Sequence, residues 1–163
     1  MTTEQRILLI TNYLTTKSLT MNNFQKSSLK EREMLTKLFN QTGISDFTFT
    51  SEKGYDRHDA EFKVLDTEFI VEVKVRNVSS TAYPDTLVDD SKVQYLIAKA
   101  KELNAVPVLV IFFSDGTYAS FNLNKHQGHL TKKYCNRTTA INTGKRFKEV
   151  RLFTLKGQIK VLS

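Results

Sequence analysis

Residues 69–76 read Phe-Ile-Val-Glu-Val-Lys-Val-Arg, with apolar and charged side chains alternating from Val71 onward. Successive side chains of a β-strand point to opposite faces of its sheet, so this alternation predicts a half-buried strand. One face of the strand carries Glu72 and Lys74. At this spacing alone, an exposed salt bridge of little energetic consequence is the simpler explanation of the two charges. The rest of the sequence has to decide whether they are functional.

A partner for this strand precedes it in the chain. Residues 59–65 also alternate, and a two-residue turn at Asp66-Thr67 would join the two strands in a β-hairpin. The register that buries both apolar faces then pairs Phe62 with Val71, Ala60 with Val73, Asp59 with Lys74 and Glu61 with Glu72. This register predicts that Asp59, Glu72 and Lys74 cluster at the open end of one polar face.

A helix before the hairpin adds another carboxylate. The helix is predicted to begin near Ser27 or Ser28 and to end before Gly43. Its apolar stripe consists of Leu35, Leu38 and Phe39. Glu31 lies one turn before Leu35 and therefore on or beside the stripe. A carboxylate there is either paired with a lysine or directed into a site, because an unpaired buried charge is costly.

The segments after the hairpin predict an α/β fold. Residues 106–113 are nearly all apolar, as expected of a central strand that is buried on both faces. A helix capped by Asp89, Asp90 or Ser91 precedes them, and this order makes residues 69–76 parallel to residues 106–113. We therefore expect a mixed central sheet flanked by helices.

The whole chain, residues 1–163, is expected to form one domain with a core at about residues 28–123 and a basic C-terminal segment at residues 124–163. The other elements expected are a helix at residues 3–14, strands at residues 44–50 and 117–123, and a last hairpin of residues 150–155 and 158–162 around Gly157.

The composition is that of an ordinary globular protein, with 163 residues of which 40% are hydrophobic and 25% charged. Cys135 is the single cysteine, so no intramolecular disulfide can form and nothing indicates an oxidising compartment. The first residues resemble neither a signal peptide nor a membrane span. We expect a cytoplasmic protein without a membrane partner, and nucleoid association or a viral origin would be compatible with this.

The net charge of +7 is concentrated in one segment. Residues 124–151 hold eight basic residues against the single acidic residue Glu149, so they account for the whole excess. The basic residues of this tract are Lys125, Lys132, Lys133, Arg137, Lys145, Arg146, Lys148 and Arg151. The aromatic residues Tyr134 and Phe147 lie among them, which is typical of a surface that binds a polyanion. A solvated lysine-rich face is the alternative, and charge alone does not separate the two.

Carboxylates and a lysine on one polar face suit the hydrolysis of a phosphodiester. The reaction needs neutralised phosphate charge, a deprotonated water and a stabilised leaving oxygen, all of which Mg²⁺ supplies. Asp59, Glu72 and the Val73 carbonyl would give Mg²⁺ the oxygen ligands that it prefers. Lys74 would position or activate the water or contact the scissile phosphate, and Glu31 would act through a water. The alternative is a charged sheet face with weak cross-strand pairs.

The order of Glu31, Asp59 and Glu72-Val73-Lys74 on helix, strand and strand resembles the PD-(D/E)xK nuclease superfamily. Residues 31–33, 69–75 and 106–109 are similar to archaeal-type Holliday-junction resolvases, within a resemblance that covers about residues 28–123. The resemblance implies a restriction-endonuclease-like core, Mg²⁺-dependent cleavage of DNA with Mn²⁺ as a substitute ion, and a role for Glu31 at the site. His58 stands where the superfamily carries a proline.

Further residues are candidates for contacts with nucleic acid. The resemblance places an extra phosphate-contacting residue near Lys92 and Gln94, although a solvated helix position explains either one equally well. Arg57 and His58 flank Asp59 and would touch the phosphate backbone. The candidates within the basic tract are Lys132, Lys133, Arg137, Lys145 and Arg146.

The sequence therefore predicts a metal-dependent DNA endonuclease, structure-selective like the junction resolvases and acting in recombination or repair. A restriction or repair nuclease on duplex DNA is one alternative, and a non-catalytic nucleic-acid-binding protein with a degenerate nuclease core is another. DNA is the expected partner, although the sequence does not separate DNA from RNA. The oligomeric state stays open, since only a pair of symmetric incisions would require a homodimer.

Overall fold

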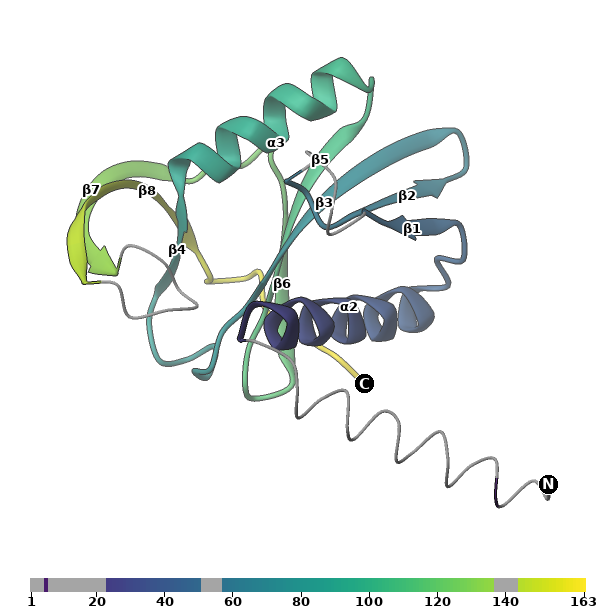
Figure 1. Ribbon diagram of the computed structural model, residues 1–163, viewed down its shortest axis with the longest axis horizontal. Helices are drawn as coiled ribbons and strands as arrows, with labels where there is room; N and C mark the ends of the chain where they lie inside the picture. Colours follow the sequence, from purple (N-terminus) through teal and green to yellow (C-terminus); the bar gives the residue numbers. More distant parts are fainter. Residues whose placement is uncertain (1–4, 6–22, 51–56, 137–143) are drawn as a thin grey trace.

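The computed structural model describes residues 5, 23–50, 57–136 and 144–163 (Figure 1). Its two helices with described bounds are α2 (Asn23–Thr42) and α3 (Asp90–Glu102). Its strands are β1 (Phe47–Phe49), β2 (Ala60–Val64), β3 (Thr67–Val75), β4 (Asp85–Asp89), β5 (Val106–Phe112), β6 (Thr117–Asn122), β7 (His129–Asn136), β8 (Lys145–Thr154) and β9 (Lys160–Val161). The helix expected at residues 3–14 lies outside the described residues, Gln5 excepted.

Six strands form a mixed sheet in the order β1-β2-β3-β5-β6-β9, and three form a second sheet in the order β4-β8-β7. β3 and β5 are parallel neighbours, and α3 lies in the connection between them. This pairing confirms the predicted crossover and the α/β fold class. Figure 1 shows α3 and α2 on opposite sides of the large sheet. No helix of the described residues is long and apolar enough to span a membrane.

The central strands separate two hydrophobic cores because their side chains alternate between the two faces. On one face, Val71 and Val73 of β3 belong to a core with Leu35 and Phe39 of α2. On the other face, the core comprises Ile70, Leu109 and Ile111 together with Val93, Leu96 and Ala100 of α3. Glu72 has the same parity as Ile70 and therefore lies on the side that α3 covers. The α3 helix thus borders the polar end of β3.

The hairpin of β2 and β3 has a different register from the predicted one. Ala60 pairs with Val71 and Phe62 with Phe69, so the turn is at Leu65-Asp66 and the strands are shifted by two residues. A shift of two leaves every side chain on its predicted face, and the apolar pattern therefore does not distinguish the two registers. The observed register stacks the Phe62 and Phe69 rings, with centroids 4.6 Å apart.

The predicted C-terminal hairpin is wrong. Gly157, with a φ of 76°, lies in the turn after β8, but β8 pairs with β4 and β7 whereas β9 pairs with β6. Both hydrogen-bonding edges of β8 are already occupied, so the last strand extends the edge of the large sheet instead. The five-residue strand β4 was not predicted from the sequence. The α2 helix begins at Asn23, before the predicted start at Ser27 or Ser28. Residues 23–26 contain no residue that would break a helix.

Candidate active site

The candidate site lies where β3 continues beyond the first residue of β2. The last pairing at this end joins Ala60 to Val71, and Asp59 immediately precedes Ala60, just outside β2. The Asp59 N–H donates to the Val71 carbonyl at 2.8 Å, and the Val73 N–H donates to Asp59 Oδ2 at 2.6 Å. A side-chain carboxylate thus takes the place of a strand carbonyl, which holds Asp59 at the open end of the hairpin.

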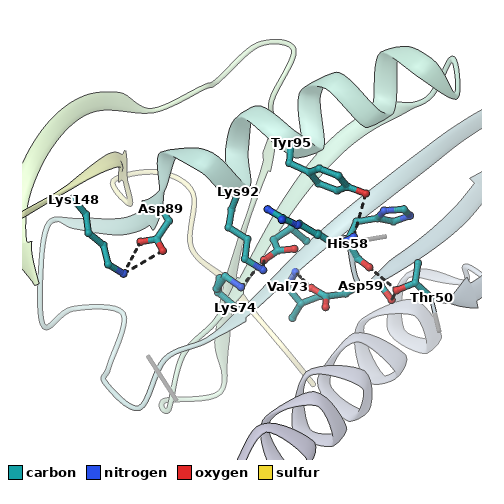
Figure 2. A network of polar contacts seen from close by, with 11 residues as sticks. Thr50, His58, Asp59, Val73, Lys74, Asp89, Lys92, Tyr95 and Lys148 are labelled. Carbon is teal, nitrogen blue, oxygen red and sulfur yellow. Dashed lines mark hydrogen bonds and ion pairs between the residues drawn. The ribbon is translucent and has the colours of Figure 1, made fainter. Parts of the chain in front are cut away.

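Glu72 lies on the face of β3 that α3 covers, and it is only 3% exposed. Its Oε1 accepts from Lys74 Nζ at 2.5 Å and lies 3.2 Å from Lys92 Nζ, on the first turn of α3. Figure 2 shows the Lys74 and Lys92 ammonium groups converging on this site, with Asp59 beside Val73. A buried carboxylate requires such partners, because an isolated ion would be too costly to desolvate. The structure therefore brings Glu72, Lys74 and Lys92 together.

Glu31 completes the group from α2. Burial raises its pKa from 4.5 to about 7, and the negative charge of Asp59 adds to the shift. Burial likewise raises the pKa of Asp59 from 3.8 to about 6, with a further contribution from Glu72. Glu33, two residues along α2, is exposed, as the helical stripe predicts. The predicted position of Glu31 beside the site therefore agrees with the structure, and its carboxylate belongs to one electrostatic cluster with Asp59 and Glu72.

Lys74 is a cation in this arrangement. Burial alone would lower its pKa, but the charge of Glu72 and the hydrogen bond to it, with Asp59 and Glu31 nearby, raise the pKa above its ordinary value. A protonated Lys74 donates hydrogen bonds and neutralises negative charge, and it does not accept a proton. This favours contact with a phosphate oxygen or orientation of a water over a role as the base.

The donor set fits a hard divalent cation by its chemistry. Asp59 and Glu72 supply carboxylate oxygens, and the N–H and C=O of one strand residue point to the same edge, so the Val73 carbonyl faces the Asp59 side. Burial, and after it the charge of Glu72, raise the pKa of Asp59, and a bound cation would oppose both effects. Among the described residues no three His, Cys, Asp or Glu side chains already lie close enough to hold a metal ion. Both lysines contact Glu72 Oε1, so Oε2 is the oxygen that a cation would reach without displacing a lysine.

The residues predicted to flank the site differ in their surroundings. Arg57 is exposed beside Tyr95, whose hydroxyl accepts from the Arg57 backbone N–H at 3.1 Å. The His58 side chain is fully buried, and its Nε2 lies 2.9 Å from Glu61 Oε1. In this conformation His58 is not available to a phosphate backbone, which departs from the prediction. Glu61 lies opposite Ile70, not opposite Glu72, because of the shifted register. Gln94 is exposed on α3.

Sequence reasoning missed Arg76. Its guanidinium donates to the Leu87 carbonyl of β4, and burial lowers its pKa while the charges of Asp89 and Glu31 oppose that shift. The period-two alternation of β3 already places Arg76 on the face of Glu72 and Lys74. The signal was therefore present, but only the pairing of β4 with β8 brings Leu87 and Asp89 to this end of β3.

The basic tract divides into two groups. Lys148 Nζ lies 3.3 Å from Asp89 Oδ2, and Arg151 Nε lies 2.5 Å from Asp90 Oδ1, so these two cations hold β8 against the start of α3. Figure 2 shows the Lys148–Asp89 pair on the same side of α3 as Lys92. Five other cations of the tract are exposed, namely Lys125, which precedes β7, and Lys132, Lys133, Lys145 and Arg146 on β7 and β8. Arg137 lies outside the described residues.

The mixed sheet flanked by two helices is a fold that is also found in a nuclease. A solved structure with this fold is that of Archaeoglobus fulgidus Hjc, a Holliday junction resolvase from an archaeal hyperthermophile, with a TM-score of 0.52 and 14% sequence identity. The match covers 78% of this chain and 88% of that chain. The chain therefore has the nuclease-like fold of that resolvase. No protein-family model and no curated protein matches the sequence.

Proposed function

We propose that this chain is a metal-dependent endonuclease that cleaves DNA, with a preference for branched structures. The observation that carries the proposal is the cluster of Glu31, Asp59 and Glu72 with Lys74 and Lys92 at the open end of one hairpin. Burying several carboxylates together costs stability, and a site that binds a divalent cation and a phosphate would explain why this cluster exists.

Each residue of the cluster has a role that follows from its surroundings. Asp59 and Glu72, with the Val73 carbonyl, would hold Mg²⁺ or Mn²⁺, which neutralises phosphate charge and lowers the pKa of a water when bound. Lys74 would donate to a non-bridging oxygen of the scissile phosphate, since its raised pKa keeps it charged. Lys92 would hold Glu72 or contact the backbone of the DNA. Glu31 would orient a water from the α2 side.

The preference for branched DNA is supported by the fold, which is shared with a Holliday junction resolvase, and by the four exposed cations of β7 and β8. A duplex-directed restriction or repair nuclease would use the same core. Paired incisions on a four-way junction would need two copies of the site, so we propose a homodimer as the active form on that substrate.

One observation favours a non-catalytic alternative. Two lysines already lie against Glu72 Oε1, so its charge is compensated without a metal ion. A nuclease core that had lost its metal and kept its affinity for DNA would show this arrangement. The two functions differ in whether phosphodiester bonds are cleaved.

The deciding experiment uses end-labelled four-way junction, flap, duplex and single-stranded DNA with Mg²⁺, with Mn²⁺ and with a chelator. We expect metal-dependent cleavage that is strongest on a branched substrate. Glu72→Gln and Glu31→Gln should each lower the rate by about 100-fold or more, the size of effect known for removing one group from a catalytic site. The matched controls are Glu68→Gln on β3 and Glu33→Gln on α2, both exposed and expected to cleave like the parent. If the parent binds these DNAs but cuts none with either ion, the binding function is the correct one.

A further inference from the structure

The β7–β8 hairpin presents a pair of aromatic rings to solvent. Tyr134 and Phe147 are direct cross-strand partners, with ring centroids 5.1 Å apart, and they are 61% and 74% exposed. Among the described residues, Tyr83 is the only other aromatic side chain in this class of exposure. A cross-strand aromatic pair stabilises a hairpin modestly, but that function does not require both rings to face water.

Exposed cations surround the aromatic pair. The alternation along each strand puts Lys132 and Lys145 on the face of the rings, and Lys133 and Arg146 on the opposite face. All four are exposed, and none of them has an ion-pair partner within the described part of the chain. Glu149, directly opposite Lys132 on the ring face, is the only acidic residue of the two strands. The four cations outnumber it, so the rings lie in a net positive field, which attracts a polyanion.

The base of this hairpin is fixed beside the candidate active site. Lys148 and Arg151 of β8 pair with Asp89 and Asp90, the residues at which α3 begins. Two residues later, Lys92 of the same helix turn reaches Glu72. In Figure 1 the β7–β8 ribbon extends away from the large sheet at the end where α3 starts. The hairpin is therefore anchored next to the helix turn that contacts Glu72, where it would meet a nucleic acid that runs past the start of α3.

We propose that Tyr134 and Phe147 form a stacking surface for unpaired bases, so that the hairpin recognises DNA with single-stranded or opened segments next to the site. The inference rests on the proposed function for its ligand, DNA. Every base offers a flat face to an aromatic ring, and surrounding cations contact the phosphates, so such a surface binds single strands with little sequence preference. A closed duplex offers only its phosphates to the hairpin, because its base faces are stacked on one another.

A second copy of the chain is the other occupant that exposed rings would suit. The charges disfavour it, because the ring face carries Lys132 and Lys145 against Glu149 alone, and a symmetric contact through the rings would bring two net positive faces together. Binding of unpaired DNA turns Lys132 and Lys145 into favourable contacts. The sedimentation behaviour of the ring variants separates the two occupants.

The test measures binding in a chelator, so that no cleavage occurs. The probes are a fluorescein-labelled oligothymidine, a fork with unpaired arms, and a fully paired, blunt-ended duplex, which serves as the closed duplex. The double variant Tyr134→Thr with Phe147→Val keeps β-branched residues in both strands. We expect it to bind the oligothymidine and the fork about 5- to 100-fold more weakly, the loss typical of one stacked base, and to bind the closed duplex like the parent.

Matched variants isolate the rings from the fold. Tyr134→Phe keeps the ring and should bind like the parent, and Tyr83→Thr removes an exposed aromatic side chain elsewhere and should do the same. If the double variant melts at a lower temperature than the parent, the single variants Tyr134→Phe and Tyr134→Thr are compared instead. Weaker binding of the fork by Tyr134→Thr alone would show that the ring is needed.

Equal loss of affinity for fork and closed duplex would overturn the proposal, as would unchanged affinity for all three probes. Conversion of a dimer into a monomer by the double variant would overturn it in favour of the second copy. The proposed function fails separately, because a parent protein that never cleaves DNA but needs its rings to bind the fork would keep this inference and lose the nuclease.

Discussion

Asp59 and Val73 are joined by a hydrogen bond of 2.6 Å from the Val73 N–H to Asp59 Oδ2, just before the first residue of β2 and alongside the continuing β3. The carboxylate therefore completes the backbone pattern of the sheet edge and carries a charge at the same position. Asparagine has nearly the shape of aspartate without its charge, so the substitution Asp59→Asn tests the proposed metal site.

The first prediction concerns Asp59→Asn. An amide oxygen can still accept from Val73, so we expect the fold to persist, but a neutral ligand binds a hard divalent cation weakly. Metal-dependent cleavage should fall by about 100-fold or more. The midpoint of a Mn²⁺ titration, followed by thermal shift, should rise markedly. As a control, Asp66→Asn in the exposed hairpin turn should leave both measurements unchanged. Parental Mn²⁺ affinity in Asp59→Asn would exclude Asp59 as a ligand.

The second prediction concerns stability against pH in the absence of metal. The pKa of Asp59 is about 6 in the folded state against 3.8 ordinarily, and that of Glu31 is about 7 against 4.5. Between about pH 4.5 and 7 the folded state therefore binds more protons than the unfolded state, so the free energy of unfolding should decrease as the pH rises through this window. Urea denaturation in a chelator should show higher stability near pH 5 than near pH 8.

The variant Glu31→Gln with Asp59→Asn provides the control for this effect. It should be more stable than the parent near pH 8, and its stability should change less between the two pH values. Asp115 does not interfere, because hydrogen bonds from Thr117 and Ser80 hold the pKa of this carboxyl below its ordinary value and its contribution is lost only in stronger acid. A parent whose stability increases from pH 5 to pH 8 would contradict the prediction.

The third prediction separates the two groups of cations in the basic tract. Arg151 is largely buried against Asp90, so Arg151→Met leaves a partly buried carboxylate without its partner. We expect a loss of about 1.5–3 kcal/mol in the free energy of unfolding, the usual value of a hydrogen bond to a charged group. Lys145→Met, at an exposed position of the same strand, should change that free energy by less than about 0.5 kcal/mol. Denaturant titration measures both, and equal losses would contradict the division.

The fourth prediction concerns the salt dependence of DNA binding. Replacing Lys132, Lys133, Lys145 and Arg146 with glutamine should weaken binding to every DNA structure. It should also flatten the slope of log K against log salt, by about 0.9 for each phosphate of a duplex that the protein no longer neutralises. Fluorescence anisotropy over a series of KCl concentrations measures the slope. An unchanged slope would show that the hairpin does not touch the phosphate backbone.

The sequence by itself determined the elements that depend on local patterns. The alternation in residues 69–76, the apolar run at residues 106–113 and the helical stripe around Leu35 predicted β3, β5 and α2 and the face on which each side chain lies. These predictions succeed because the periodicity of a strand or helix is a property of neighbouring residues. Glu31, Glu72 and Lys74 were selected on that basis, whereas Asp59 was selected through the predicted hairpin register. The structure places all four in one cluster.

Only the tertiary structure decided the features that depend on which edges and faces meet. A shift of two residues preserves the faces of a hairpin, so the pattern could not distinguish the observed pairing of Ala60 with Val71 from the predicted one. The pairing of β8 with both β4 and β7 likewise joins segments that are distant in the chain. That pairing places Lys148 and Arg151 against the start of α3 and leaves Tyr134 and Phe147 in solvent. The sequence did not predict it, because hydrogen bonds between distant strands leave no pattern in neighbouring residues.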